Sequence, residues 1–158
     1  MQEREDYDLN GGISTTLLMI QGSYRDHAKV ELHLADILPI RANGSEMNQV
    51  LLSVVINAVQ AIKERYQAPD QGIITITTRM DGYNVVCEIA DNGVGIPEDI
   101  AKRVFEPFFT TKPPGHGTGL GLSVAHDAVT KMDGEIRVES VKGVGTKISI
   151  LLPWNRKD

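Results

Sequence analysis

Residues 73–96 decide the fold, and they read IITITTRMDGYNVVCEIADNGVGI. Two runs within them, 73–80 and 83–90, are rich in Val, Ile and Thr, which are common in strands. Asp81-Gly82 between the runs is a strong signal for a two-residue hairpin turn. The second run leads directly into the polar, glycine-rich segment Asp91-Asn92-Gly93-Val94-Gly95-Ile96. The stretch therefore predicts an antiparallel hairpin whose second strand ends in a turn.

Further elements flank this hairpin. Residues 46–65 form the clearest helix, because their apolar residues recur at helical spacing and make a broad core face. These residues are Met47, Val50, Leu51, Val54, Val55, Ala58, Val59 and Ile62. Other helices are predicted at 13–28, 98–104 and 118–132, and other strands at 30–34, 135–140 and 146–152. The helix at 118–132 is expected to end at a glycine cap, Asp133-Gly134.

These elements amount to about three substantial helices and five strands. Hairpins and helical crossovers are mixed along the chain, which predicts an α/β fold, a two-layer α/β sandwich on a mixed five-stranded sheet. The 158 residues suit one domain, and the sequence contains neither an internal repeat nor an interdomain linker. Residues 1–8, MQEREDYD, are charged, and we expect a frayed terminus or the end of a truncated helix there.

Composition excludes several classes of protein. The formal net charge is −5, so a basic surface that binds nucleic acid is not expected. The longest apolar stretch, 50–62, is interrupted by Ser53, Asn57 and Gln60 and is shorter than the roughly 20 residues of a membrane span. Cys87 is the single cysteine, so no internal disulfide can form. The composition is that of an ordinary globular domain.

Glycines gather in three places, at 93 and 95, at 115, 117, 119 and 121, and at 143 and 145. A single cluster is explained by a tight turn as well as by a ligand-binding loop. Three clusters beside polar residues favour a nucleotide site, because glycine lets main-chain N–H groups approach a phosphate closely. Residues 115–122, GHGTGLGL, open a predicted helix, and such an N-terminus binds anions. The segment lacks the Gly-Lys-Ser/Thr ending of a P-loop.

Two polar residues are candidates for ligand contacts. Asn57 lies in mid-helix among apolar neighbours, in a polar stripe with Ser53, Gln60 and Glu64. Such a stripe is usually a solvated edge, but the amide oxygen of Asn57 also suits Mg²⁺. Asp91 follows a Val- and Ile-rich strand. It either belongs to an ordinary turn or accepts a hydrogen bond from the exocyclic amine of a flat ring that the nearby glycines admit.

Residues 105–112, FEPFFTTK, contain all three phenylalanines of the chain. Prolines and glycines over 105–117 argue against regular structure, so we expect an exposed loop. Exposed phenylalanines would form a costly apolar patch, so this segment must pack against something or move. Lys112 at its end is suited to meet a phosphate as a point charge.

In this order, the four segments resemble the ATP-binding catalytic domain of sensor histidine kinases, within the GHKL (Bergerat-fold) ATPase superfamily. Residues 48–58 resemble its N box, 91–96 its G1 box, 105–112 its F box and 115–122 its G2 box. Residues 143–146 resemble its last glycine-threonine turn, and residues 8–10 its opening. The resemblance implies a Bergerat fold with three main helices on one face of the sheet. It also divides the chain into 1–10, a truncated linker or terminus, and 11–155, the catalytic domain.

The resemblance implies roles for individual residues. Asn57 would ligate Mg²⁺ that bridges the ATP phosphates, and Asp91 would bind the adenine amine. The remaining nucleotide-binding residues would be Gly93, Gly95, Ile96 and Thr146 on the adenine side, and Lys112, Gly117, Thr118, Gly119, Leu120 and Gly121 in a lid over the phosphates. Lys63 and Arg103 are further candidates for phosphate contacts, although both also suit a plain surface role.

The implied activity is that of a protein-histidine kinase in a two-component system. The γ-phosphoryl group of ATP would pass to a histidine on a separate dimerisation domain, for relay to the receiver domain of a response regulator. None of the four histidines is expected to be the acceptor: His27, His33 and His116 lack a following acidic residue, and His126 lies inside the catalytic domain. The chain is therefore expected to be part of a longer kinase. We expect it to be cytoplasmic, without nucleic-acid or direct membrane contact, while the parent kinase can be membrane-tethered.

Position 53 departs from the family pattern, because Ser53 stands where an Asn is usual. Related hydrolases carry a Glu there that activates water, a task for which a serine hydroxyl is unsuited. This difference favours transfer to a protein nucleophile. Two alternatives stay open. One is a serine-protein kinase of the anti-sigma-factor type, against which the long opening segment 8–45 argues, and the other is a degenerate domain that only binds a nucleotide or a partner.

Overall fold

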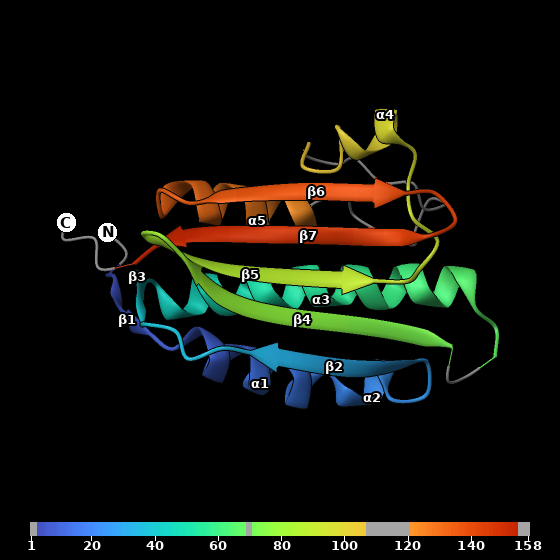
Figure 1. The fold of residues 1–158 in the computed structure, drawn as a ribbon, viewed down its shortest axis with the longest axis horizontal. Helices are drawn as coiled ribbons and strands as arrows, with labels where there is room; N and C mark the ends of the chain where they lie inside the picture. The colour runs from blue at the N-terminus through green and yellow to red at the C-terminus, as the bar shows by residue number, and fades with distance from the viewer. Residues whose placement is uncertain (1–2, 69–70, 107–120, 155–158) are drawn as a thin grey trace.

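In the computed structural model, which describes residues 3–68, 71–106 and 121–154, five strands form one mixed sheet in the order β2-β4-β5-β7-β6. Their bounds are Ala28–Leu34 (β2), Gly72–Asp81 (β4), Asn84–Asp91 (β5), Glu135–Val141 (β6) and Gly145–Pro153 (β7). β2 is parallel to β4, and the other neighbours are antiparallel. Helices α1 (Leu9–Met19), α3 (Gly44–Arg65) and α5 (Gly121–Lys131) lie on one face of the sheet (Figure 1). The predicted two-layer α/β sandwich is confirmed.

Helix α3 forms the centre of the helical layer. It begins two residues before the predicted start, because the side chain of Asn43 caps it by accepting a hydrogen bond from the Glu46 amide at 3.0 Å. All eight apolar residues predicted for its core face are buried. They share one core with sheet residues such as Ile74 and Ile89. Each fully buried aliphatic side chain of this kind contributes about 1.5–3 kcal/mol to folding.

A small second sheet joins the two ends of the described chain. β1 (Glu5–Tyr7) pairs antiparallel with β3 (Ile40–Ala42), and an isolated bridge links Ile40 to Trp154. The expectation of a frayed terminus or a helix end over 1–8 is therefore wrong for residues 5–7. Alternation could not reveal β1, because it has three residues and buries only Tyr7.

Side chains from this N-terminal segment also bond to two helices. The Tyr7 hydroxyl donates to the side-chain oxygen of Asn48 on α3. The Arg4 guanidinium donates to the main-chain carbonyl of Lys131, the last residue of α5. The segment before α1 is thus attached to both α3 and α5.

The helix predicted over 13–28 is in fact two helices. α1 starts at Leu9 and ends at Met19, and α2 (Gln21–Tyr24) follows it. Ile20 separates them, with φ −107° and ψ 13° instead of helical values. β2 then begins at Ala28, two residues before the predicted strand.

Three predicted ends shift slightly. In the β4–β5 hairpin, Asp81 pairs with Asn84, so the two-residue loop is Gly82-Tyr83, one residue later than predicted. Helix α4 (Glu98–Ala101) is shorter than the predicted 98–104. The chain turns after α5 at the predicted Asp133-Gly134, but Asp133 adopts the left-handed conformation, with φ 61°.

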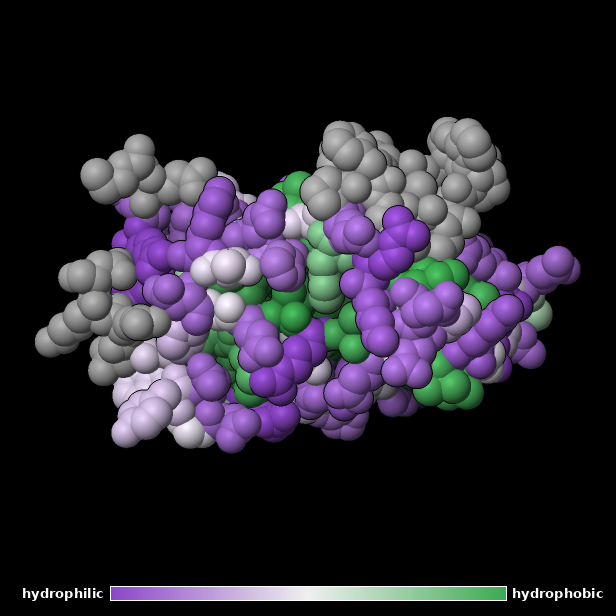
Figure 2. All heavy atoms as spheres, turned by 90° about the horizontal axis from the view of Figure 1, so that it is seen from above, coloured by the Kyte–Doolittle hydropathy of each residue, from purple (hydrophilic) through white to green (hydrophobic). Residues whose placement is uncertain are grey.

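The described residues on the face shown in Figure 2 are largely hydrophilic. Seen from above, hydrophobic residues appear as small patches between hydrophilic ones (Figure 2). Within the three described ranges, no helix combines the length and the apolar character needed to cross a membrane.

Candidate functional site

The turn after β5, residues 91–96, is pressed against α3. A Cβ on Gly93 would lie 2.5 Å from the main-chain carbonyl carbon of Ala61, and the Val94 amide donates to the Ala61 oxygen at 3.1 Å. Only glycine permits this approach. Asn57 precedes Ala61 by four residues, about one helical turn, so the two share a face of α3. The turn and Asn57 therefore border the same side of this helix.

Asp91 is the last residue of β5, and its carboxylate is held by main-chain donors. Its Oδ1 accepts a hydrogen bond from the Gly93 amide at 2.8 Å. Burial raises the pKa of the Asp91 carboxyl from 3.8 to about 6, and hydrogen bonds from the main chain of Gly93 and Thr146 oppose the rise. The carboxylate is therefore ionised at neutral pH in a partly desolvated position. A group in that state is a strong acceptor for an N–H donor of a ligand.

Thr146, near the start of β7, lies directly opposite Asp91 in the sheet and is buried. Its hydroxyl is 2.7 Å from that of Ser140 on β6. The Ser140 hydroxyl also accepts from the Ile96 amide at 2.9 Å and donates to the Gly145 carbonyl at 3.1 Å. Ser140 thus ties the turn after β5 to the beginning of β7. Sequence reasoning missed it, because only the register of β6 against β7 reveals the contact.

The structure brings most of the described candidate residues to one end of the sheet (Figure 1). Asp91, Gly93, Gly95, Ile96 and Thr146 come together there, and Asn57 lies near them on α3. Gly121 is the first residue of α5, which packs along α3. The other candidates, Lys112, Gly117, Thr118, Gly119 and Leu120, lie outside the described residues.

Phe105 of the predicted F box packs against the core, partly buried. Its ring stacks on that of His126 from α5, with 5.3 Å between centroids and 28° between planes. His126 is therefore engaged in packing, and its Nδ1 is 3.7 Å from the Asp127 carboxylate. Arg103 pairs with Glu106 at 2.9 Å, whereas Lys63 is exposed on α3.

The side-chain oxygens near the site suit a metal ion that the phosphates of a nucleotide also bind. Within the described ranges, no group of three or more His, Cys, Asp or Glu side chains is placed to bind a metal. Asn57 offers an amide oxygen from a half-buried position on α3. The hydroxyl of Ser53, one turn earlier, accepts a hydrogen bond from the side-chain amide of Gln49 at 3.3 Å. Mg²⁺ commonly takes one or two protein oxygens together with phosphates and water, and these residues fit that pattern.

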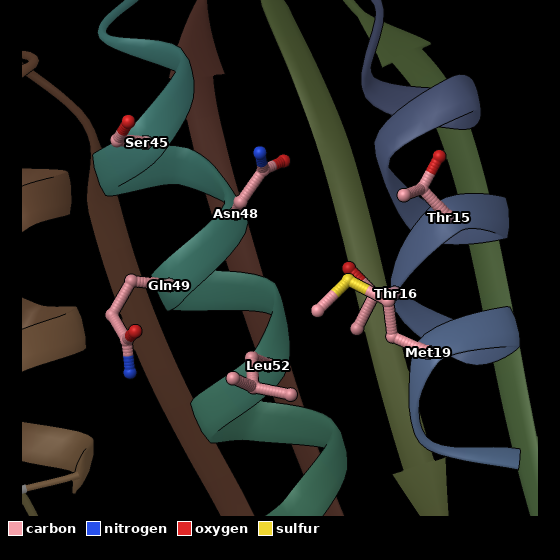
Figure 3. A pocket seen from close by; sticks show the side chains of 7 residues that line it. All are labelled: Thr15, Thr16, Met19, Ser45, Asn48, Gln49 and Leu52. Carbon is pink, nitrogen blue, oxygen red and sulfur yellow. The ribbon is translucent and has the colours of Figure 1, made fainter.

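A hollow of about 270 Å³ lies between α1 and the first half of α3. Thr16 and Met19 point into it from α1, and Asn48 points towards them from α3 (Figure 3). It is lined by Thr15, Thr16, Met19, Ser45, Asn48, Gln49 and Leu52. This lining includes no charged side chain, so the hollow is poorly suited to a triphosphate.

Comparison with known proteins gives one consistent family. The family model described as histidine kinase-, DNA gyrase B- and HSP90-like ATPase matches residues 42–156. The chain is 37% identical over 155 residues to the sensor histidine kinase ZraS of Escherichia coli O157:H7, covering 96% of this chain and 32% of that protein. It is 40% identical over 119 residues to sporulation kinase E of Bacillus subtilis, covering 75% of this chain and 15% of that protein.

A solved structure shares the whole fold. The catalytic domain of the histidine kinase ThkA superposes with a TM-score of 0.81 at 26% identity, over 96% of both chains. The present chain spans about a third or less of the length of the curated relatives named above.

Proposed function

Because the chain belongs to the histidine kinase-, DNA gyrase B- and HSP90-like ATPase family, we propose that it is the ATP-binding catalytic domain of a sensor histidine kinase. In this proposal it donates the γ-phosphoryl group of ATP to a histidine on another domain, from which a response regulator receives it. The observation that carries the proposal is the position of the Asp91 carboxylate: it lies at the end of β5 opposite Thr146 and accepts a hydrogen bond from Gly93, in a turn that packs against α3.

The adenine ring would bind at the turn after β5. An ionised carboxylate has about four acceptor positions. Gly93 and Thr146 supply two main-chain hydrogen bonds to Asp91, so capacity remains for the exocyclic amine. Gly95, Ile96 and Thr146 would line the same pocket. Partial burial of Asp91 strengthens this hydrogen bond and makes the position selective for a base that donates there.

The phosphates would lie towards Asn57 and the start of α5. Mg²⁺, when bound with the nucleotide, would neutralise phosphate charge. Asn57 would hold the ion through its amide oxygen. Gly121 is the first described residue of the 11-residue helix α5, and the N-terminus of a helix favours an anion through its amides and its dipole. Lys112, Gly117, Thr118, Gly119 and Leu120 would complete the lid over the phosphates.

The transfer step needs positioning more than covalent help from this chain. An imidazole nitrogen of the acceptor histidine would bond to the γ-phosphorus while the bond to the oxygen bridging the β- and γ-phosphates breaks and ADP leaves. Ser53 has no carboxylate with which to activate water. This supports transfer to a protein side chain over hydrolysis.

The serine-protein kinase alternative is less well supported. Two relatives aligned over 96% of the chain are named as a sensor histidine kinase and a signal transduction histidine-protein kinase, and such an alignment takes in the opening segment as well as the boxes. The degenerate-domain alternative lacks the transfer step. A domain that binds only a partner would not bind ATP, and one that only binds a nucleotide would bind ATP without transferring its γ-phosphoryl group.

Calorimetric titration of ATP into the chain, with and without Mg²⁺, tests the proposal. We expect micromolar binding to the wild type, loss of binding in Asp91→Ala, and Mg²⁺-independent residual binding in Asn57→Ala. Arg137→Ala on the exposed edge of the sheet serves as the control and should bind like the wild type. No binding by the folded wild type under any metal condition would reject the proposal.

A further inference from the structure

The guanidinium of Arg65, the last residue of α3, bonds to two separate turns. Its Nη1 donates to the main-chain oxygens of Asn92 at 2.9 Å and Gly93 at 3.1 Å, both in the turn after β5. The same nitrogen donates to the oxygen of Val144 at 3.1 Å, in the turn between β6 and β7. The guanidinium carbon also lies over the ring of Tyr66, 5.0 Å from its centroid. Basic residues are common in the last turn of a helix, so the sequence alone does not distinguish Arg65.

The two turns that Arg65 joins lie next to Asp91 and Thr146, the residues proposed to bind adenine. Asn92 and Gly93 directly follow Asp91, and Val144 precedes Thr146 by two residues. The turns also touch without Arg65, because the Gly143 amide donates to the Val94 oxygen at 2.7 Å. Arg65 adds a link from both turns to the end of α3.

We propose that Arg65 is a positioning residue for base recognition. It fixes the turn after β5 against the turn between β6 and β7, and so holds in place the turn whose Gly93 amide bonds to the Asp91 carboxylate, beside its strand partner Thr146. This inference rests on the proposed function of the site. Arg65 acts through main-chain carbonyls, so its effect reaches the nucleotide through Asp91 and Thr146.

Arginine is well suited to this task. A guanidinium is always charged and carries several N–H donors in a rigid plane, and a charged donor makes a stronger hydrogen bond to a carbonyl than a neutral one. Lysine has a shorter side chain and lacks the planar guanidinium that lies over Tyr66, so it is expected to reach the two turns less well.

The test compares ADP with inosine diphosphate, which lacks the exocyclic amine. Arg65→Met keeps an unbranched apolar side chain at this position, and it removes every donor together with the guanidinium that lies over Tyr66. We expect the affinity for ADP, measured by calorimetry, to fall roughly tenfold, the size of effect expected for lost hydrogen bonds from a charged donor. Inosine diphosphate should lose less, so the ratio of the two affinities shrinks. A purely structural role would weaken both nucleotides equally and leave the ratio unchanged.

Arg41→Met is the matched control. Arg41 also donates to a main-chain carbonyl, that of Arg4 at 3.1 Å, and pairs with Asp6, but it lies on β3 in the small sheet. Its nucleotide affinities should equal those of the wild type. If Arg65→Met does not fold, Arg65→Lys makes the same test, with a smaller decrease in the ratio expected.

The outcomes separate this inference from the proposed function. Failure of the folded wild type to bind ADP would reject both. In a second outcome, the wild type binds ADP, but the ratio of the affinities for ADP and inosine diphosphate is unchanged in folded Arg65→Met, or in Arg65→Lys where that variant replaces it. This outcome would overturn the role of Arg65 and leave the proposed function standing.

Discussion

Gly145 of β7 lies so close to the main-chain carbonyl of Asp91 that a Cβ on Gly145 would stand 2.0 Å from that oxygen. Its φ of 150° belongs to a region that side-chain-bearing residues rarely adopt. The contact joins β5 and β7 at the point where β5 ends. It therefore sets the distance between the chain segments that carry Asp91 and Thr146.

Replacement of this glycine should damage both the fold and the site. We expect Gly145→Ala to lower the free energy of unfolding by about 2–4 kcal/mol, because the methyl group clashes with the Asp91 carbonyl and the φ becomes strained. Urea unfolding measures the loss, and calorimetry should show weaker ATP binding.

Gly143 provides the control, since its φ is 82° but a Cβ there would meet open space. Gly143→Ala should cost only about 1 kcal/mol. Equal losses in the two variants would mean that backbone strain, and not contact with Asp91, explains the need for Gly145.

Asp91→Asn should stabilise the protein at alkaline pH while abolishing ATP binding. Burial raises the pKa of Asp91 to about 6, so the folded state holds this proton more tightly than the unfolded state. The contribution of Asp91 to stability is therefore fully present below about pH 4 and lost as the pH rises through 6. At pH 8 the amide should raise the free energy of unfolding by about 1–3 kcal/mol, and the gain should fade towards pH 4. Thermal unfolding of the wild type and the variant at pH 8 and at pH 4 checks whether the substitution stabilises the protein only at the higher pH.

The same pKa predicts how ATP affinity depends on pH. A protonated Asp91 is a poorer acceptor for the adenine amine, so the affinity should fall below about pH 6, by at most roughly tenfold per pH unit. Calorimetry between pH 5 and 8 measures the dependence. A flat profile in the wild type would exclude Asp91 as the group that meets the base.

Asn57→Ala should remove the dependence of ATP binding on Mg²⁺ with little effect on the adenine side. The amide oxygen is the protein ligand assigned to the ion, so the variant should bind ATP about as weakly with Mg²⁺ as without it. Gln49→Ala, an exposed position two turns earlier on α3, is the control and should keep the metal effect. A metal effect of wild-type size in Asn57→Ala would assign the ion to other residues.

Cys87 should be inert in the folded protein. It is completely buried on β5, and burial raises the pKa of its thiol to about 12. A thiol reagent at pH 8 should label it only after urea is added. Rapid labelling in buffer would show that β5 separates readily from its neighbours.

The sequence predicts those parts of the fold that are marked by a pattern of neighbouring residues. The apolar face of α3 repeats over several turns, and the β4–β5 hairpin combines β-branched runs with an Asp-Gly pair. Both therefore appear in the structure nearly as predicted. β1 was missed because it is short and charged, and its pairing partner β3 lies more than thirty residues away.

Within the site, the same distinction holds. Asp91 and the glycines of its turn are visible in the sequence because turn residues following a strand are informative on their own. Ser140 and Arg65 are not, because their contacts reach residues 44 and 79 positions away, respectively, and depend on strand register and on the end of α3. No local pattern encodes such contacts.

Strand β3 holds the first strand and the last described residue at the same end of the molecule, through its pairing with β1 and the bridge between Ile40 and Trp154. The Asp91 turn lies at the opposite end of the sheet (Figure 1). Polypeptide attached before Glu5 and after Trp154 would thus leave from neighbouring points. Both connections to other domains would then lie at the end of this domain that is far from Asp91. A rigid-body rotation about this attachment end would displace the Asp91 turn more than any part nearer the attachment. A modest rotation would therefore suffice to move the turn towards an acceptor on another domain or away from it.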